Sequence, residues 1–201
     1  MKVYDETFYN HELKRALLPP RKLAIQYKIP MSDKEAYERV IEIMNNIKQF
    51  VKEGKNLLLW SKEQGTGKTL MAIKIAESYI AQRNEKCRAT DCAVFINVGD
   101  LLFYRKDFSN PESQELVRKL EDKINKCRLV IWDDLGTKDL SDYDKEYLIV
   151  LLNRRLNDLA KSNIYTTNLT SNQLFEVVGA RLSSRLFEDT EVIEFKGGDH
   201  R

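Results

Sequence analysis

A glycine-rich segment between a short apolar run and a long amphipathic stretch constrains the fold of this chain most. The apolar run is LLLW at 57–60, the glycine-rich segment is SKEQGTGKT at 61–69, and LMAIKIAESYIAQR follows at 70–83. A strand, a glycine loop and a helix in this order can form a phosphate-binding site. Backbone N–H groups of the loop and the N-terminus of the helix then converge on the phosphate oxygens. The alternative is a glycine turn at the start of an ordinary helix.

The segment departs from the usual phosphate-loop pattern at one position. The pattern is G-x-x-x-x-G-K-[ST], and Lys62 stands where the first glycine belongs. Lys68 is expected to reach the β- and γ-phosphates, and Thr69 is expected to place its hydroxyl on Mg²⁺. We expect binding to survive, whereas Lys62 puts the rate of hydrolysis in question. The predicted nucleotide-binding residues of this segment are Gln64, Gly65, Thr66, Gly67, Lys68, Thr69 and Leu70.

Short apolar runs and longer amphipathic stretches alternate after Gly54. Each run is mostly apolar, as expected for strands of a parallel sheet that helices cover on both faces. Strands that alternate with helices predict an α/β domain of three layers. The predicted strands are 57–60, 93–98, 129–132, 163–167 and 191–195, and the predicted helices are 68–83, 99–106, 112–125, 142–161 and 171–187.

Residues 1–53 are predicted to form a helical segment and connector ahead of a core at 54–201. Ser32 is expected to cap one helix that runs to Gly54. The apolar residues near the N-terminus can either pack on the protein's own core or form a docking face for a partner. These residues are Phe8, Tyr9, Leu13, Leu17 and Leu18.

Composition excludes several classes of protein. Of 201 residues, 42% are hydrophobic and 32% are charged, which suits a packed core with a solvated surface. No apolar run is long enough to cross a bilayer and the N-terminus is too polar for a signal peptide, so we expect a cytoplasmic protein without membrane contact. The net charge of +2 permits nucleic-acid binding but does not argue for it. Cys87, Cys92 and Cys127 form no metal-type doublet, and we expect reduced thiols.

Two acids follow the predicted strand at 129–132. Asp133 and Asp134 would lie at the carboxyl edge of the sheet, where ligands of open α/β folds bind. Asp133 suits a Mg²⁺ contact, and Asp134 suits orienting or deprotonating an attacking water. Such a strand end is common by itself, but its spacing after the glycine loop indicates a Walker B segment.

Polar residues after the fourth strand and on the last helix are further candidates. Asn168 could hold the attacking water by a hydrogen bond, or it could cap the helix that starts near Ser171. Arg181 and Arg185 are four residues apart and share one helix face. They are either ordinary solvated arginines or arginines that reach the γ-phosphate in a neighbouring subunit.

The order of these motifs resembles the DnaC/DnaI/IstB group of AAA+ ATPases, which are replicative helicase loaders and transposition helpers. The resemblance covers residues 54–201 and rests on the glycine loop, VIWDDLG, NRRL, TTN, GARLSSRLFE and the terminal GGDHR. The sequence looks particularly similar to loader-like proteins encoded by phages of Gram-positive hosts. It lacks the cysteine-rich zinc module of Gram-positive loaders, so docking on a helicase would use residues 1–31 or a partner protein.

The resemblance implies a five-stranded parallel sheet in the order 5-1-4-3-2, without a separate lid domain. It implies that ATP and Mg²⁺ bind between subunits of a ring or spiral. Asn168 matches sensor 1, Arg181 and Arg185 match the arginine finger, and Arg201 resembles a sensor 2 residue.

The group also carries an extra helical element after the second strand that contacts single-stranded DNA. The corresponding stretch here combines bases with aromatics, a composition suited to phosphate attraction and base stacking. A solvated helix end with core aromatics is the alternative. The candidate DNA-binding residues are Tyr104, Arg105, Lys106 and Phe108.

The resemblance predicts an ATPase that loads a hexameric replicative helicase onto single-stranded DNA. One alternative is an IstB-like ATPase that assists a transposase. Another is an adaptor or competitor of a host loader that binds ATP without hydrolysing it, which Lys62 would favour.

Overall fold

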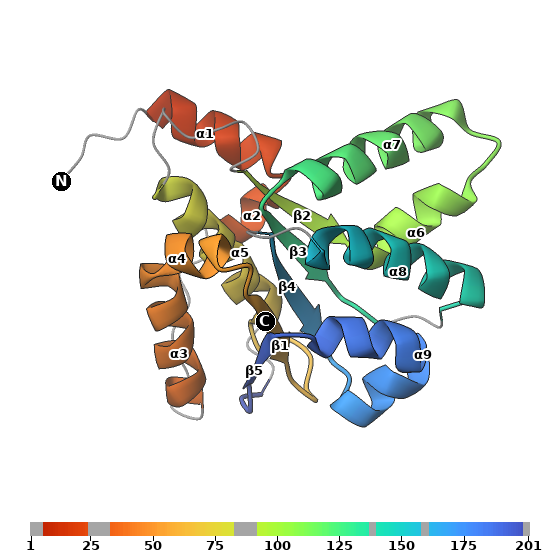
Figure 1. Cartoon of the computed structure of the whole chain (residues 1–201). Helices are drawn as coiled ribbons and strands as arrows, with labels where there is room; N and C mark the ends of the chain where they lie inside the picture. Colours follow the sequence, from red (N-terminus) through yellow and green to blue (C-terminus); the bar gives the residue numbers. More distant parts are fainter. Residues whose placement is uncertain (1–5, 24–32, 83–91, 137–139, 158–160, 199–201) are drawn as a thin grey trace.

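The computed structural model describes residues 6–23, 33–82, 92–136, 140–157 and 161–198 (Figure 1). Its centre is a parallel sheet of five strands in the order β2-β3-β4-β1-β5. The predicted order is therefore confirmed, and each predicted strand lies within two residues of its observed bounds. The strands are β1 Asn56–Trp60, β2 Ala93–Asn97, β3 Leu129–Asp133, β4 Ser162–Thr167 and β5 Thr190–Glu194.

Helices cover both faces of this sheet, because side chains on each strand point alternately to opposite faces. Leu57 and Leu59 pack with the helices of one face, and Leu58 packs with those of the other. Figure 1 shows α1 to α5 on one side of the sheet and α6 to α9 on the other, which confirms the three layers. The helices are α1 Glu6–Arg15, α2 Pro20–Leu23, α3 Lys34–Asn45, α4 Ile47–Lys52, α5 Lys68–Ala81, α6 Val98–Lys106, α7 Pro111–Lys126, α8 Asp142–Leu156 and α9 Ser171–Phe187.

The single helix predicted between Ser32 and Gly54 is wrong in one respect. The chain breaks at Asn46 into α3 and α4, because Asn46 leaves the helical angles with φ −109° and ψ 19°. Ser32 lies outside the described residues. Asp33 precedes α3, and its buried carboxylate accepts hydrogen bonds from the backbone N–H groups of residues 196 and 197 instead of capping the helix. A long-range contact thus replaces the local cap that sequence patterns suggest.

The N-terminal helix packs on the core of the sheet domain. Leu18 is buried, Leu13 packs against the same cluster, and the Tyr9 hydroxyl donates to Glu77 at 2.8 Å. The Phe95 N–H of edge strand β2 donates to the Ala16 carbonyl at 2.8 Å. For these described residues, the structure supports packing on the protein's own core. Leu17 is exposed, and the side chain of Phe8 lies outside the described part.

The expectation of reduced thiols is wrong for two of the three cysteines. Cys92 and Cys127 form a disulfide, with Cα atoms 4.8 Å apart. Cys92 precedes β2 and Cys127 ends α7, so 35 residues of sequence separate two positions that the fold brings together. Cys87 lies outside the described residues. Within the described part of the chain, no helix is long and apolar enough to cross a membrane.

Candidate phosphate-binding site

The glycine loop connects β1 to α5 and has the backbone conformation that its glycines permit. Gly65 and Gly67 have positive φ angles of 71° and 91°, which side chains with a Cβ rarely adopt. Gly67 is the N-cap of α5, so the loop leads directly into the helix N-terminus. Lys62 is exposed and is not among the residues with positive φ. Lys62 in place of the first glycine therefore causes no backbone strain at that position.

The side chain of Lys68 is buried inside this loop. Its ammonium donates to the Glu63 carbonyl and to the Thr66 hydroxyl, both at 3.1 Å. Thr66 is itself buried, and the Ser61 hydroxyl accepts a hydrogen bond from the Glu63 N–H at 3.2 Å. The loop thus surrounds the Lys68 ammonium, which is the group that the sequence predicts to bind the β- and γ-phosphates.

The two acids at the end of β3, of which Asp133 is its last residue and Asp134 the next, are fixed by one hydroxyl of the neighbouring strand. Thr166 donates to an Oδ atom of Asp133 at 2.7 Å and accepts from the Asp134 N–H at 3.0 Å. Asp134 has a φ of 58°, an uncommon value for a residue other than glycine, and such values concentrate at functional sites. Sequence reasoning missed Thr166, although a hydroxyl at the end of the strand that pairs with β3 was the available signal.

Asn168 follows β4 at the same edge of the sheet. The Thr167 carbonyl accepts a hydrogen bond from the Ser61 N–H at 3.3 Å, which joins the end of β4 to the start of the glycine loop. The Asn168 side-chain oxygen is buried and has no hydrogen-bond partner. The N-cap of α9 is Thr170, so the alternative role of Asn168 as a helix cap is wrong. A buried orphan acceptor is costly and fits a ligand-facing position.

The structure does not bring Arg181 or Arg185 to the glycine loop of the same chain. Both lie on α9, and each guanidinium group pairs with a carboxylate: Arg181 with Glu146 and Arg185 with Glu188. Both arginine side chains are partly solvated, as expected for ordinary surface arginines. They are not buried in the core, so they are also accessible for a contact with a neighbouring subunit. Arg201 lies outside the described residues.

The residues at the carboxyl edge of the sheet fit a nucleoside triphosphate with Mg²⁺. Glycine N–H groups and the Lys68 ammonium suit phosphate oxygens, and the unpartnered Asn168 oxygen and the Asp133 carboxylate lie on adjacent strand ends. No group of three or more His, Cys, Asp and Glu that could hold a metal ion occurs in the described part of the chain. Mg²⁺ bound to phosphates needs only one or two protein ligands, for which Thr69 and Asp133 are the candidates.

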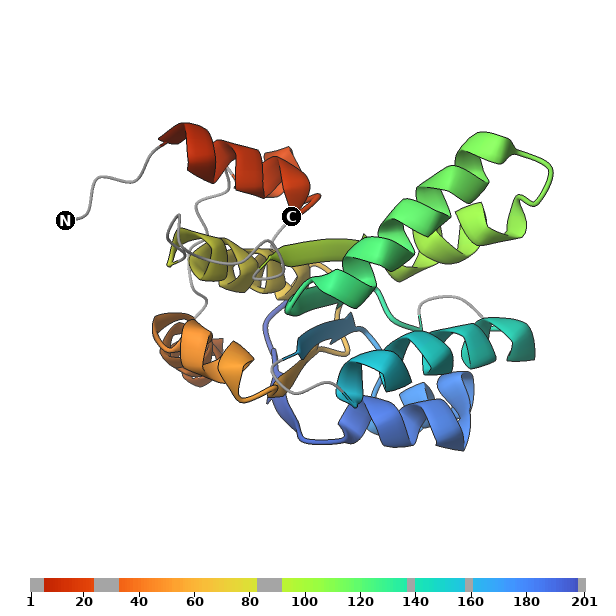
Figure 2. The same ribbon diagram turned by 45° about the horizontal axis from the view of Figure 1, so that its top comes forward.

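The four candidate DNA-binding residues lie at the end of α6 or just after it, where residues of α8 contact Arg105 and Lys106. Figure 2 shows α6 and α7 side by side as a hairpin at the outer end of the molecule. The Arg105 guanidinium stacks on two rings of α8, 3.8 Å from the centroid of Tyr143 and 4.0 Å from that of Tyr147. Lys106 pairs with buried Asp144 at 2.7 Å. Both bases of this candidate DNA-binding set therefore contact side chains of α8, although the Lys106 side chain remains 52% exposed.

Exposed aromatic rings also lie in this corner between α6 and α8. The exposed fractions are 67% for Phe103, 66% for Phe108 and 57% for Tyr143, whereas Tyr104 is half-buried against the Phe103 ring. Phe103 and Tyr143 were missed by sequence reasoning. Tyr143 lies on α8, and only the fold places it beside α6.

Two pKa shifts follow from contacts in this corner. Burial and then the hydrogen bond to Glu121 raise the pKa of Tyr147 above its usual value. Burial acts to raise the pKa of Asp144, but hydrogen bonds from Lys106 and Ser141 outweigh it, so that pKa lies below its usual value. Asp144 is thus a charged anchor for both α6 and the N-terminus of α8.

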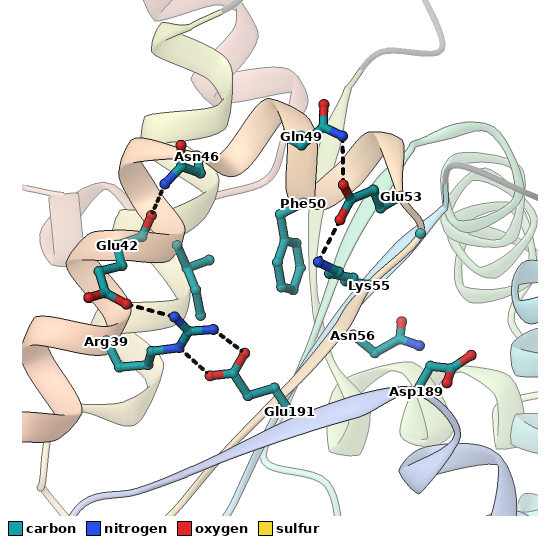
Figure 3. Close-up of a pocket in the computed structure, with 12 residues that line it drawn as sticks. Arg39, Glu42, Asn46, Gln49, Phe50, Glu53, Lys55, Asn56, Asp189 and Glu191 are labelled. Carbon is teal, nitrogen blue, oxygen red and sulfur yellow. Dashed lines mark hydrogen bonds and ion pairs between the residues drawn. The ribbon is translucent and has the colours of Figure 1, made fainter.

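A separate hollow of about 840 Å³ lies between α3–α4 and the first residues of β1 and β5 (Figure 3). Arg39 crosses it, donating to both carboxylate oxygens of Glu191 at 2.5 and 2.9 Å and to Glu42 at 2.6 Å. Asn56, the first residue of β1, borders the hollow, whereas the glycine loop follows the last residue of that strand. The hollow is therefore at the opposite edge of the sheet and is no part of the phosphate site.

The sheet order, the glycine loop before α5 and the acids at the end of β3 define a P-loop NTPase of the AAA+ class. The chain belongs to the IstB-like ATP binding protein family, whose model matches residues 3–201. No curated protein sequence matches the chain.

Solved structures agree with this assignment of the fold. The chain is similar to the DnaC helicase loader, with 23% identity and a TM-score of 0.70 over 89% of this chain and 100% of that one. It is similar to DnaI, with 21% identity and a TM-score of 0.70 over 89% of this chain and 94% of that one. A structure of the replication initiator DnaA bound to AMPPCP and single-stranded DNA matches with 17% identity and a TM-score of 0.63, over 89% of this chain and 50% of that one.

Proposed function

We propose that the chain is an ATPase that loads a hexameric replicative helicase in DNA replication. The observation that carries the proposal is the meeting of three polar strand ends at one edge of an AAA+ sheet, together with a likeness to the DnaC helicase loader over 89% of the chain. ATP binds at subunit interfaces of a ring or spiral and stabilises that assembly on single-stranded DNA. Hydrolysis releases the assembly.

The residues of the glycine loop bind the triphosphate. Lys68 exchanges its two loop acceptors, the Glu63 carbonyl and the Thr66 hydroxyl, for oxygens of the β- and γ-phosphates. Backbone N–H groups at Gly65 and Gly67 complete the cradle, as in other phosphate loops. Thr69 and Asp133 would hold a Mg²⁺ ion, which would supply positive charge to neutralise charge that develops on the phosphates. Binding thus reuses donors that the folded loop already places together.

The acids and Asn168 act on the attacking water. Asp134 orients this water or takes its proton, and Thr166 fixes the backbone from which the Asp134 side chain projects. Asn168 turns its buried, unpartnered side-chain oxygen to the same water. An arginine of α9 reaches the γ-phosphate in the next subunit, so that turnover depends on assembly.

Single-stranded DNA contacts the α6–α8 corner. Exposed rings of Phe103, Phe108 and Tyr143 offer stacking surfaces for successive bases, and stacking of this kind tolerates any sequence. Arg105 holds Tyr143 in place by stacking on its ring. Lys106 adds positive charge, which its ion pair with Asp144 partly offsets. Three of the four residues that the sequence singles out, Arg105, Lys106 and Phe108, thus contribute in different ways.

The test is an ATPase assay with and without single-stranded DNA, combined with capture of partner proteins in the presence of ATP. We expect turnover in the parent protein, loss of turnover with retained nucleotide binding in Asp134→Asn, and loss of binding in Lys68→Ala. Capture of a hexameric helicase supports the loader. Unchanged nucleotide binding in Lys68→Ala would refute the phosphate site itself.

The family description favours a second candidate, an IstB-like ATPase that assists a transposase. Capture of a transposase and stimulation by duplex DNA would support it over the loader. The adaptor that binds ATP without hydrolysing it rested on Lys62. That residue has an ordinary backbone conformation and an exposed side chain, so its presence gives the adaptor no structural support.

A further inference from the structure

Strand β5 is an outer strand of the sheet and, in the described part of the chain, pairs with β1 alone. Just before β5, the Asp189 carbonyl accepts from the Asn56 N–H at 3.3 Å. Just after it, the Phe195 N–H donates to the Trp60 carbonyl at 2.9 Å. Because peptide groups along a strand point alternately to its two sides, the odd-numbered residues of β5 direct their N–H and C=O groups to β1. The even-numbered residues direct theirs to the free side of the strand, and they are Thr190, Val192 and Glu194.

The outer strand on the opposite side, β2, is covered by the chain itself. The Phe95 N–H of β2 donates to the Ala16 carbonyl at 2.8 Å. At β5, the Asp33 carboxylate accepts from the Lys196 N–H, but this contact lies beyond the end of the strand. Among the described residues, backbone groups of β1 alone bond to the main chain of β5. A free strand of this kind can accept a further strand, whose main-chain hydrogen bonds then supply affinity.

A groove of about 270 Å³ lies between α3 and β5 and is lined by no residue of β1. It adjoins the hollow of about 840 Å³ described above, since Arg39 and Glu191 line both. Figure 3 shows Arg39 of α3 and Glu191 of β5 meeting across that hollow. A polypeptide placed along the free side of β5 would therefore have α3 as its second wall.

The groove and the hollow carry an excess of negative charge. The residues that line them include six acids and three bases, whereas the whole chain has a net charge of +2. Two of these bases, Arg39 and Lys55, already pair with acids. Three exposed carboxylates form no hydrogen bond or ion pair within the described part of the chain, and they belong to Glu35, Asp189 and Glu194. The charge of this surface is thus complementary to that of a basic polypeptide.

We propose that the free side of β5 binds an extended, basic segment of a partner protein, which pairs with β5 as an added strand. The main chain of Thr190, Val192 and Glu194 bonds to the backbone of the segment. Lysine or arginine side chains of the segment face the carboxylates of Glu35, Asp189 and Glu194. Nucleic acid is disfavoured because its phosphates are repelled, and a second copy of this chain would bring two acidic surfaces together. This inference goes beyond the proposed ATPase function and does not depend on it.

A labelled peptide provides the direct test. The probe is a capped, fluorescent peptide of alternating lysine and valine, about as long as β5, and fluorescence anisotropy measures its Kd for the whole chain. A matched peptide with glutamate in place of lysine should bind at least about tenfold more weakly. A lysine peptide with methylated backbone nitrogens cannot donate main-chain hydrogen bonds and should also bind at least about tenfold more weakly.

Variants of the protein test the two contributions separately. Val192→Pro removes one outward N–H, and proline is tolerated on the free side of an outer strand. It should raise the Kd of the lysine peptide about tenfold. Val192→Thr keeps the N–H and should change the Kd by less than about twofold. The double variant Glu35→Lys with Glu194→Lys should raise the Kd about tenfold by reversing two charges. Thermal unfolding checks that each variant is folded.

Hydrogen exchange tests the free side of β5 without any variant. The amides of Val192 and Glu194 should exchange faster than those of Glu191 and Ile193, and the lysine peptide should slow them. Slow exchange of Val192 and Glu194 in the monomer without peptide would show that another part of the chain covers β5. Protection that appears only on self-association would assign the strand to a second copy. Either result overturns the inference, as does equally tight binding of the glutamate peptide or of the methylated peptide.

Discussion

Thr166→Val removes one hydroxyl and tests how the Walker B acids are held. The change is nearly isosteric, but it deletes the hydrogen bond to the Asp133 carboxylate at 2.7 Å and the one from the Asp134 N–H at 3.0 Å. A hydrogen bond to a charged group contributes about 1.5–3 kcal/mol, and a neutral one about 1 kcal/mol. We therefore expect a loss of about 2–4 kcal/mol in the free energy of unfolding. Both lost hydrogen bonds involve buried or half-buried groups, which water cannot readily satisfy.

Thr166→Ser is the matched control, because it keeps the hydroxyl and loses only a buried methyl group, which is about 1 kcal/mol. Urea unfolding at constant m-value measures both variants. For a chain of this size the Val variant should lower Tm by about 5–15 °C. Loss of a hydrogen bond that orients a metal-binding or catalytic acid typically costs about 10–100-fold in activity. Equal stability and equal ATP turnover in the Val and Ser variants would refute this account of Thr166.

Three further predictions concern other sites. Lys62→Gly should change ATP turnover by less than about twofold and lower stability by up to about 1 kcal/mol, because the position needs no positive φ; a tenfold rise in turnover would contradict this. Burial acts to raise the pKa of Asp144, but the hydrogen bonds that its carboxylate accepts outweigh burial, so the folded pKa lies below the usual value. Its stabilising effect is therefore present above the unfolded pKa of about 3.9 and is lost as pH falls through the lower folded pKa. Urea midpoints of Asp144→Asn should fall below those of the parent at pH 7 and approach them below pH 4, whereas a constant difference would rule out this linkage. The Cys92–Cys127 disulfide should contribute about 4 kcal/mol, given the 35-residue separation of its ends. Thiol titration with and without reductant, compared with unfolding of Cys92→Ser, measures it; three reactive thiols in the unfolded, unreduced chain would show that no disulfide forms.

The strands and the phosphate loop could be predicted because their signals are local. An apolar run of five residues between helices is a buried parallel strand, and the loop glycines occupy positions that favour positive φ. The same reasoning located the two acids, since the end of a parallel strand defines the edge at which they lie. The predicted strand order, which came from the family resemblance, is the order that the structure has.

Contacts between residues that are distant in sequence could not be predicted. Ser32 was the predicted cap, but Asp33 is the residue that precedes α3, and its carboxylate binds backbone N–H groups 163 and 164 residues away. Arg105 and Lys106 look like free bases in the sequence, yet α8 supplies aromatic rings and a buried carboxylate for them. Burial and ionic contacts of this kind depend on which elements the fold places side by side, and no local pattern encodes that.

By itself the sequence determined that this chain is an α/β nucleotide-binding domain with its phosphate loop after the first strand. Hydrophobic periodicity and loop chemistry act over fewer than twenty residues, so the sequence alone suffices for them. The tertiary structure alone decided that Lys62 is unstrained, that Thr166 holds both acids and that Arg181 and Arg185 have different partners. Each of these depends on a backbone angle or on a contact between distant residues, which exist only once the sheet has brought its strand ends to one edge.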